Sequence, residues 1–188
     1  MEHPHPAPPP RSADRAALLR RARELGVPAD YGRAHGLVRM REPLRLGFIG
    51  HDVHGRPQWL APRAAVALRR LRAAAATDHI GIELVSAFRS VEYQLGILER
   101  KRARGQSIEE ILRVSAAPGY SEHHSGRAVD LTAAGFVPLE ESFEQAPAFA
   151  WLQQRAADFG FRLSYPRGNA HGIAYEPWHW CWHSRPPA

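Results

Sequence analysis

Helix-forming and strand-forming segments follow one another in an irregular order along the 188 residues of this chain, which limits the folds that it can adopt. Residues 64–76 are rich in alanine, and Pro62 precedes them at a favoured helix start. Residues 81–88 come next and are rich in strand formers. Further helices are expected at 16–25, 91–104, 107–116 and 148–160, a short strand or hairpin at 44–62, and strands at 127–132, 161–165 and 173–183. Because the strands are few and need not be parallel, the sequence predicts the α+β class, with a small antiparallel sheet flanked by helices.

The length fits one domain preceded by a short extension. From His3 to Pro10, proline alternates with small or polar residues, a composition that favours an extended and poorly packed chain. We therefore expect a flexible tail at residues 1–11 and a single domain at residues 12–188. Ser12 or Asp14 is expected to cap the first helix.

The net charge of +6 and the pI near 10.2 would suit an anionic partner such as nucleic acid, acidic lipid or a cell-wall polymer. The basic residues are scattered, and Lys101 is the only lysine among 25 basic residues. This distribution favours a solvated, arginine-rich surface and argues against a nucleic-acid partner. No run of about 18 apolar residues predicts a transmembrane segment, and the first residues lack the apolar core of a secretory signal. A complete chain of this kind would be cytoplasmic.

A group of potential metal ligands stands out in the C-terminal half. His123 lies in an expected loop, Asp130 on the strand that follows, and Gly126 between them permits a tight reversal. Downstream, His179 supplies a third ligand, and Glu176 adds a carboxylate three residues before it. Three protein ligands, a position for water and a nearby carboxylate are what a catalytic zinc needs. A closed structural zinc site is disfavoured, because the chain has one cysteine.

These residues resemble the signature of the VanY-type zinc D-Ala-D-Ala carboxypeptidases, in the superfamily that also contains lysostaphin and the hedgehog signalling domain. The patterns S-x-H-x-x-G-x-A-x-D and E-x-W-H are filled by Ser121, His123, Gly126, Ala128 and Asp130, and by Glu176, Trp178 and His179. Residues 86–90 are similar to the family's S-G-[YF]-R-S segment, with Ala87 in place of glycine. The resemblance extends from about Leu44 to Trp180.

The resemblance implies a monomeric carboxypeptidase with one zinc ion, which removes the C-terminal D-alanine from peptidoglycan stem peptides in the periplasm or cell envelope. It implies that His123, Asp130 and His179 bind the metal and that Glu176 is the catalytic base. It also implies that Arg89 stabilises the transition state, and that Ser121 and Gln94 bind the substrate.

Three alternatives stay open. The same zinc chemistry would serve an L,D-carboxypeptidase acting on tetrapeptide stems or an endopeptidase cutting within the stem, and pocket depth decides among them. A zinc-stabilised binding module without activity is disfavoured because Glu176 and Arg89 are both present. Residues 180–182, Trp-Cys-Trp, replace the tyrosine or arginine that often follows the second motif, which leaves the shape of one pocket wall open.

The remaining histidines and the cysteine are expected to have structural roles. His124 is expected to lie behind the ligands or at the surface. If the last strand continues, its period of two places Cys181 and His183 on the face of His179, and Trp178, Trp180 and Trp182 on the other face, in the core. Five further histidines are expected in loops or in solvent, namely His3, His5, His51, His54 and His171.

Overall fold

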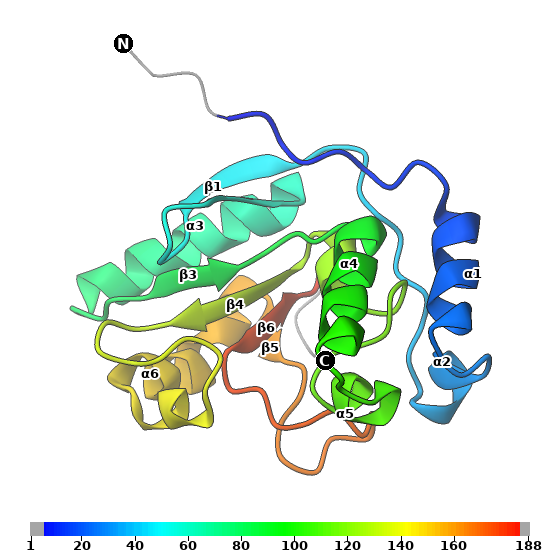
Figure 1. The fold of residues 1–188 in the computed structure, drawn as a ribbon. Coiled ribbons are helices and arrows are strands. Elements are labelled where there is room, and N and C mark those ends of the chain that lie inside the picture. Colours follow the sequence, from blue (N-terminus) through cyan, green and yellow to red (C-terminus); the bar gives the residue numbers. More distant parts are fainter. Residues whose placement is uncertain (1–5, 185–188) are drawn as a thin grey trace.

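A four-stranded antiparallel sheet lies at the centre of the fold in a computed structural model that describes residues 6–184 (Figure 1). The strand order is β3-β4-β6-β5, with β3 at Glu83–Ser86, β4 at Ala128–Thr132, β6 at His179–Trp182 and β5 at Phe161–Leu163. Helices cover both faces, so the predicted α+β class is confirmed. His3 and His5 lie outside the described residues.

A separate hairpin pairs β1 (Gly47–His51) with β2 (Pro57–Leu60), as residues 44–62 predict. Asp52 closes its turn by accepting hydrogen bonds from the backbone N–H groups of His54 and Arg56, each at 2.9 Å. The hairpin leads directly into α3 (Pro62–Thr77), which begins at the expected proline.

The larger hydrophobic core lies between one face of the sheet and two helices, α3 and α6 (Pro147–Arg155), with the short helix η3 (Ala156–Phe159) beside them. Side chains alternate along the strands, so Val129, Leu131 and Trp180 enter this core. Their neighbours in sequence, among them Asp130 and His179, occupy the opposite face. Trp178 and Trp182 pack against the same core, which confirms the expected tryptophan face.

A smaller and wholly helical core lies on the other side of the sheet, where α1 (Arg15–Glu24), α2 (Tyr31–Ala34), α4 (Val91–Ala103) and α5 (Ile108–Arg113) meet. Each of the three longer helices has a side-chain cap. Asp14 accepts from the N–H of Ala17 at 2.9 Å, Ser90 from Tyr93 at 3.1 Å, and Ser107 forms a capping box with Glu110. The predicted cap of the first helix is therefore confirmed as Asp14 and not the alternative Ser12.

Two features differ from expectation. The strand expected at residues 173–183 covers only His179–Trp182, because a turn in which the His179 N–H donates to the Glu176 carbonyl at 3.0 Å precedes it. The expectation for residues 173–178 was therefore wrong. Three short helices, α2, η1 (Glu122–Ser125) and η2 (Glu141–Gln145), were not expected.

Residues 6–11 form neither helix nor strand, whereas Ser12 is fixed by two hydrogen bonds to the Glu42 carboxylate, at 2.7 and 2.8 Å. The described part of the chain contains no helix both long and apolar enough to cross a membrane. The flexibility of the tail at residues 1–11 and the extent of the domain stay predictions.

Candidate metal centre

The three predicted metal ligands meet on the sheet face that points away from the larger core. His123 comes from η1, Asp130 from β4 and His179 from the start of β6. In the strand register Asp130 lies between Ser86 and His179, so strand pairing holds two of the ligands side by side. One potential ligand atom of each residue lies within 4.8 Å of the other two.

Hydrogen bonds orient both imidazoles for metal binding. His123 donates from Nδ1 to the Ala87 carbonyl at 2.6 Å, and His179 donates from Nε2 to the Glu122 carboxylate at 2.9 Å. The other ring nitrogens then face Asp130, His123 Nε2 at 3.2 Å and His179 Nδ1 at 3.1 Å. A tetrahedral zinc with bonds of about 2.0–2.1 Å would hold its ligand atoms about 3.3 Å apart.

The chemistry of this donor set fits zinc. The buried Nε2 of His123 makes no hydrogen bond within the described structure. Burial, together with the charge of Arg89, lowers the pKa of His123 to about 4, so its imidazole is in the neutral form that binds metals. Burial alone would raise the pKa of Asp130, but His123 and His179 lower it far below its ordinary value, so this ligand is ionised.

Glu176 and Arg89 complete the group. Glu176 Oε2 lies 3.7 Å from His179 Nδ1, and burial, together with the charge of Asp130, raises the pKa of Glu176 to about 7. Arg89 places Nη2 4.0 Å from an Asp130 oxygen, while its buried Nε has no hydrogen-bond partner in the described structure. A carboxylate that can exchange protons near neutrality and an arginine with free donors therefore stand beside the predicted ligands.

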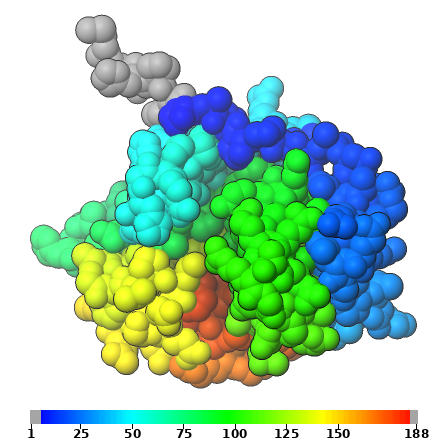
Figure 2. Space-filling model, in the orientation of Figure 1, coloured from blue at the N-terminus to red at the C-terminus, as the bar shows by residue number. Residues whose placement is uncertain are grey.

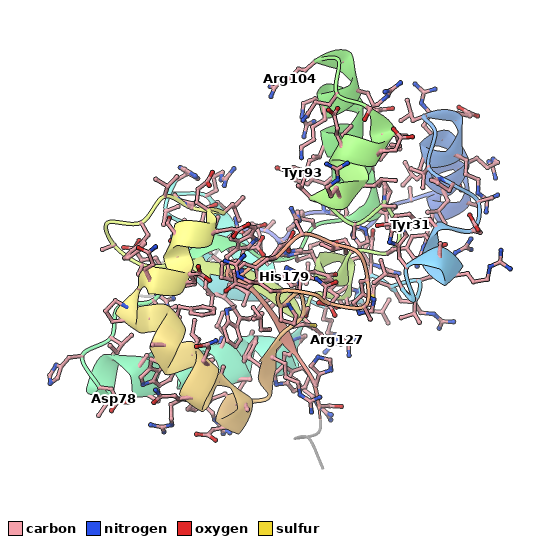
Figure 3. All side chains as sticks on the ribbon, turned by 90° about the horizontal axis from the view of Figure 1, so that it is seen from below. Tyr31, Asp78, Tyr93, Arg104, Arg127 and His179 are labelled. Carbon is pink, nitrogen blue, oxygen red and sulfur yellow. The ribbon has the colours of Figure 1, made fainter. Side chains whose placement is uncertain are left out.

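These side chains open into a cleft of about 370 Å³ between the two helical layers. Figure 2 shows the hollow between the yellow segment and the green α4, with orange and red chain at its floor, and His179 lies near the middle of the molecule in Figure 3. The lining combines the predicted site with side chains from α4, the segment after α5 and the loop before β6: Arg89, Lys101, Val114, Ser115, Ala116, Ser121, His123, Asp130, Leu139, Glu140, Glu141, Tyr165, Ala174, Tyr175, Glu176, Trp178 and His179.

The two predicted substrate-binding residues are placed differently. Ser121 lines the cleft. Gln94 is buried in α4, where its amide donates to Ser115 Oγ at 2.8 Å and to the Ala116 carbonyl at 3.0 Å. Gln94 therefore holds a segment of the cleft wall and is not among the residues that line it. Its role in binding, like that of Ser121, stays a prediction.

His124 is fully buried, so the alternative that placed it at the surface was wrong. It donates from Nδ1 to the Arg89 carbonyl at 2.7 Å, and its Nε2 accepts from the Gly119 N–H at 3.1 Å. The interpretation that it lies behind the ligands is confirmed, and it fixes the backbone that carries Arg89.

Two residues near the site were not found in the sequence. Glu122 bonds to His179 but occupies a variable position of the first motif, and Lys101 lines the cleft from α4. Lys101 is the only lysine in the sequence, which sets it apart, but nothing in the sequence places it near the motifs.

The Trp-Cys-Trp segment at residues 180–182 is not part of the lining, so this departure from the family pattern leaves the described cleft wall unchanged.

Comparison with known proteins agrees with this geometry. The family described as VanY: D-alanyl-D-alanine carboxypeptidase matches residues 57–185. The putative carboxypeptidase YodJ of Bacillus subtilis (strain 168) is 32% identical over 128 residues, which cover 65% of this chain and 45% of YodJ. The chain thus spans about half the length of that relative.

Two solved structures are similar in fold and in sequence. The LdcB LD-carboxypeptidase has a TM-score of 0.68 and 28% identity, over 75% of this chain and 69% of LdcB. A vancomycin resistance D,D-pentapeptidase VanY in complex with Zn(II) has a TM-score of 0.59 and 25% identity, over 79% of this chain and 87% of that one. Since the matched family covers both motifs and most of the sequence, the chain belongs to the VanY family of D-alanyl-D-alanine carboxypeptidases.

Proposed function

We propose that this protein is a zinc-dependent carboxypeptidase that removes the C-terminal D-alanine from peptidoglycan stem peptides. The observation that carries the proposal is the convergence of His123, Asp130 and His179 with Glu176 and Arg89 on one cleft. We assign the first three as ligands of one zinc ion. A solved VanY relative was crystallised with Zn(II), and another, VanYB, with D-alanine-D-alanine.

The chemistry follows from the positions of the side chains. Bound zinc would supply a polarised water of lowered pKa. Glu176 lies beside the proposed ligands, and a pKa of about 7 suits a group that would accept a proton from the attacking water and return it to the leaving amine. Arg89 lines the same cleft, and its cationic guanidinium would stabilise the negative charge that develops on the carbonyl oxygen.

Lys101 supports an enzyme that acts at a chain end. Its side chain is partly buried in the cleft wall and has no ion-pair partner within residues 6–184. Burial and the charge of Arg89 lower its pKa, so an anion beside it would be favourable. A free terminal carboxylate would supply that anion, and Ser121 is a further candidate for binding it.

A second candidate is an L,D-carboxypeptidase, which removes the terminal D-alanine of a tetrapeptide stem. The similarity to LdcB, at a TM-score of 0.68, favours it. Both activities would use the same metal ligands, base and arginine. The two activities differ in the substrate residue on the N-terminal side of the scissile bond, which the cleft must accommodate.

Incubation of the zinc-loaded protein with penta- and tetrapeptide stems, followed by mass analysis, separates the candidates. Loss of one alanine from the pentapeptide alone supports the D,D activity, and loss from the tetrapeptide alone supports the L,D activity. Cleavage within the stem indicates an endopeptidase. Intact peptides in the presence of bound zinc would contradict the proposal and favour an inert module.

Stem peptides with a C-terminal amide test the role of Lys101. The wild-type protein should cleave the free acid faster than the amide, and Lys101→Met should lose this preference. Arg104→Met removes the same charge from an exposed position at the C-terminal end of α4 and should keep the preference for the free acid. An unchanged preference in Lys101→Met would show that another group binds the carboxylate.

The proposed substrate places the enzyme in the cell envelope. We propose that it acts there as a monomer, since one chain supplies every assigned ligand, the base and the arginine. Light scattering of the zinc-loaded protein would measure the oligomeric state.

A further inference from the structure

Glu122 is a partly buried carboxylate that lies beside the proposed metal centre. It neighbours His123 in sequence, but it is not among the residues that line the cleft. Its Oε2 lies 2.9 Å from Nε2 of His179, the ring nitrogen opposite the one that faces Asp130. Glu122 therefore contacts a proposed ligand from the side that substrate does not reach.

The surroundings of Glu122 are arranged to keep this carboxylate in place. Ser164, which follows β5, donates its hydroxyl to the same Oε2 at 2.5 Å. The Glu122 carboxylate is thus held between a ring nitrogen from β6 and a hydroxyl that follows β5.

Two carboxylates flank the His179 ring, since Asp130 Oδ1 lies 3.1 Å from Nδ1 and Glu122 Oε2 lies 2.9 Å from Nε2. A half-turn of the ring about Cβ–Cγ would exchange Nδ1 with Cδ2 and Nε2 with Cε1 at little cost in shape, so packing alone distinguishes the two orientations poorly. With Glu122 accepting a hydrogen bond from Nε2, the ring presents Nδ1 toward Asp130, where the metal would bind. Such a partner also makes the imidazole a stronger ligand.

We propose that Glu122 is a positioning residue for the metal centre, which fixes the orientation and tautomer of His179 so that Nδ1 is presented to the zinc. The inference rests on the proposed role of His179 as a ligand. It requires no contact between Glu122 and the substrate. Ser164 then belongs to the support of the site, because its hydroxyl holds the Glu122 carboxylate in place.

Zinc affinity measured by competition with a chelator tests the proposal without any peptide. Glu122→Ala should weaken zinc binding by about 10- to 100-fold. Glu122→Gln keeps an oxygen acceptor without the charge and should lie between Glu122→Ala and the wild type. Ser164→Ala should have a smaller effect, and Glu109→Ala, which removes an exposed carboxylate on α5, should have none.

A spectroscopic measurement separates positioning from packing. In the zinc-loaded wild type, ¹H–¹⁵N spectra of the His179 ring should show a slowly exchanging proton on Nε2, and in Glu122→Ala this signal should exchange rapidly or vanish. Wild-type zinc affinity and a retained Nε2 signal in both Glu122 variants, with lower thermal stability alone, would overturn the proposal. If Glu122→Ala does not fold, Glu122→Gln decides by the same two measurements.

The same experiments distinguish this inference from the proposed function. A wild-type protein that binds zinc but cleaves no stem peptide would contradict the carboxypeptidase assignment and leave the Glu122 result standing. A wild-type protein without zinc affinity would overturn the inference itself.

Discussion

The two cores of this protein differ in what they contribute to the cleft. The sheet layer, with α3 and α6 behind it, carries Asp130 and His179 on fixed strands. The helical layer of α1, α4 and α5 contributes Lys101 and part of the opposite wall. The family match begins at residue 57, so it includes the whole sheet but neither α1 nor α2. The proposed chemistry thus resides in the layer shared with the family, whereas the N-terminal helices pack behind the wall that faces it.

This difference separates the expected effects of substitution. Changes in the sheet layer should remove metal or turnover and leave most of the folding free energy intact. Changes in the N-terminal layer should lower stability and leave the ligands in place. Substitutions that violate this division would show that the two layers are more tightly coupled than their contacts indicate.

The largest effect is expected for His179→Ala in the sheet layer. Loss of one of three ligands should weaken zinc binding by roughly 1000-fold or more and abolish hydrolysis. Metal analysis after dialysis measures zinc binding, and peptide assays measure hydrolysis. His54→Ala, in the exposed hairpin turn, is the matched control and should retain zinc. Full zinc content in His179→Ala would remove this residue from the ligand set.

Glu176→Gln should separate metal binding from turnover. Glutamine keeps the shape of the side chain but cannot accept the proton of the water, so turnover should fall by roughly 100-fold or more. Zinc content and melting temperature should match the wild type. Activity close to that of the wild type at equal zinc content would show that Glu176 is not the base.

Arg89→Ala tests the residue that lies at the boundary between the layers, before α4. If its guanidinium stabilises developing charge, kcat should fall by roughly 100-fold, which corresponds to about 3 kcal/mol. Arg89→Lys should recover part of this, since lysine keeps the charge without the planar fork of donors. A rise in KM with unchanged kcat would instead assign Arg89 to binding of the substrate's carboxylate.

The sequence predicted which side chains gather in the sheet layer better than it predicted the support of either layer. The grouping of the three proposed ligands with Glu176 was predicted because metal chemistry demands particular residue types at short spacings. Glu122 was missed because it occupies a motif position at which the family pattern specifies no residue type. Its contact with His179, 57 residues away, could not be inferred from local sequence. Pairings over such separations depend on strand register, which local patterns do not encode.

The same reason explains what was missed in the N-terminal layer. Glu42 accepts hydrogen bonds from Ser12 and from the N–H of Val91, 49 residues away, at 2.6 Å. The short helix α2 has four residues, too few for a periodic signal. The starts of the helices with side-chain caps, by contrast, were predicted to within about one residue, because an N-terminal cap is a local interaction.

Glu42→Gln should lower stability in a pH-dependent way. Burial would raise the pKa of Glu42, but bonds from Val91 and Ser12 lower it below its ordinary value. A carboxylate with a lowered pKa stabilises the fold above its unfolded pKa of 4.5, and this contribution is lost as the pH falls through the lower folded value. The variant should lose about 1.5–3 kcal/mol at pH 7 and less at acid pH.

Urea unfolding at several pH values measures this effect. The difference between wild type and variant should shrink below the unfolded pKa, while zinc content at pH 7 stays unchanged. A difference that does not depend on pH would show that the loss comes from packing and not from the charge.

The smallest effect is expected where α2 meets the loop that carries Glu176. His35 Nδ1 donates to the His171 carbonyl at 2.6 Å, and His171 Nδ1 donates to the His35 carbonyl at 2.8 Å. His35→Ala removes one of these bonds and should cost about 1 kcal/mol, or about 2–4 °C in melting temperature. Calorimetry checks this value, with His54→Ala as control. A large fall in kcat would show that α2 positions Glu176 directly.

The side-by-side pairing of Asp130 with His179 also fixes the order of events during biosynthesis. Forty-nine residues separate the two ligands, and they meet only when β4 and β6 have paired. A nascent chain therefore holds no preformed site, and we expect the proposed ion to join a sheet that has already assembled. An ion that binds after the rate-limiting step leaves the folding rate unchanged and slows unfolding. Zinc should thus lengthen the lifetime of the folded protein against proteolysis without accelerating its formation.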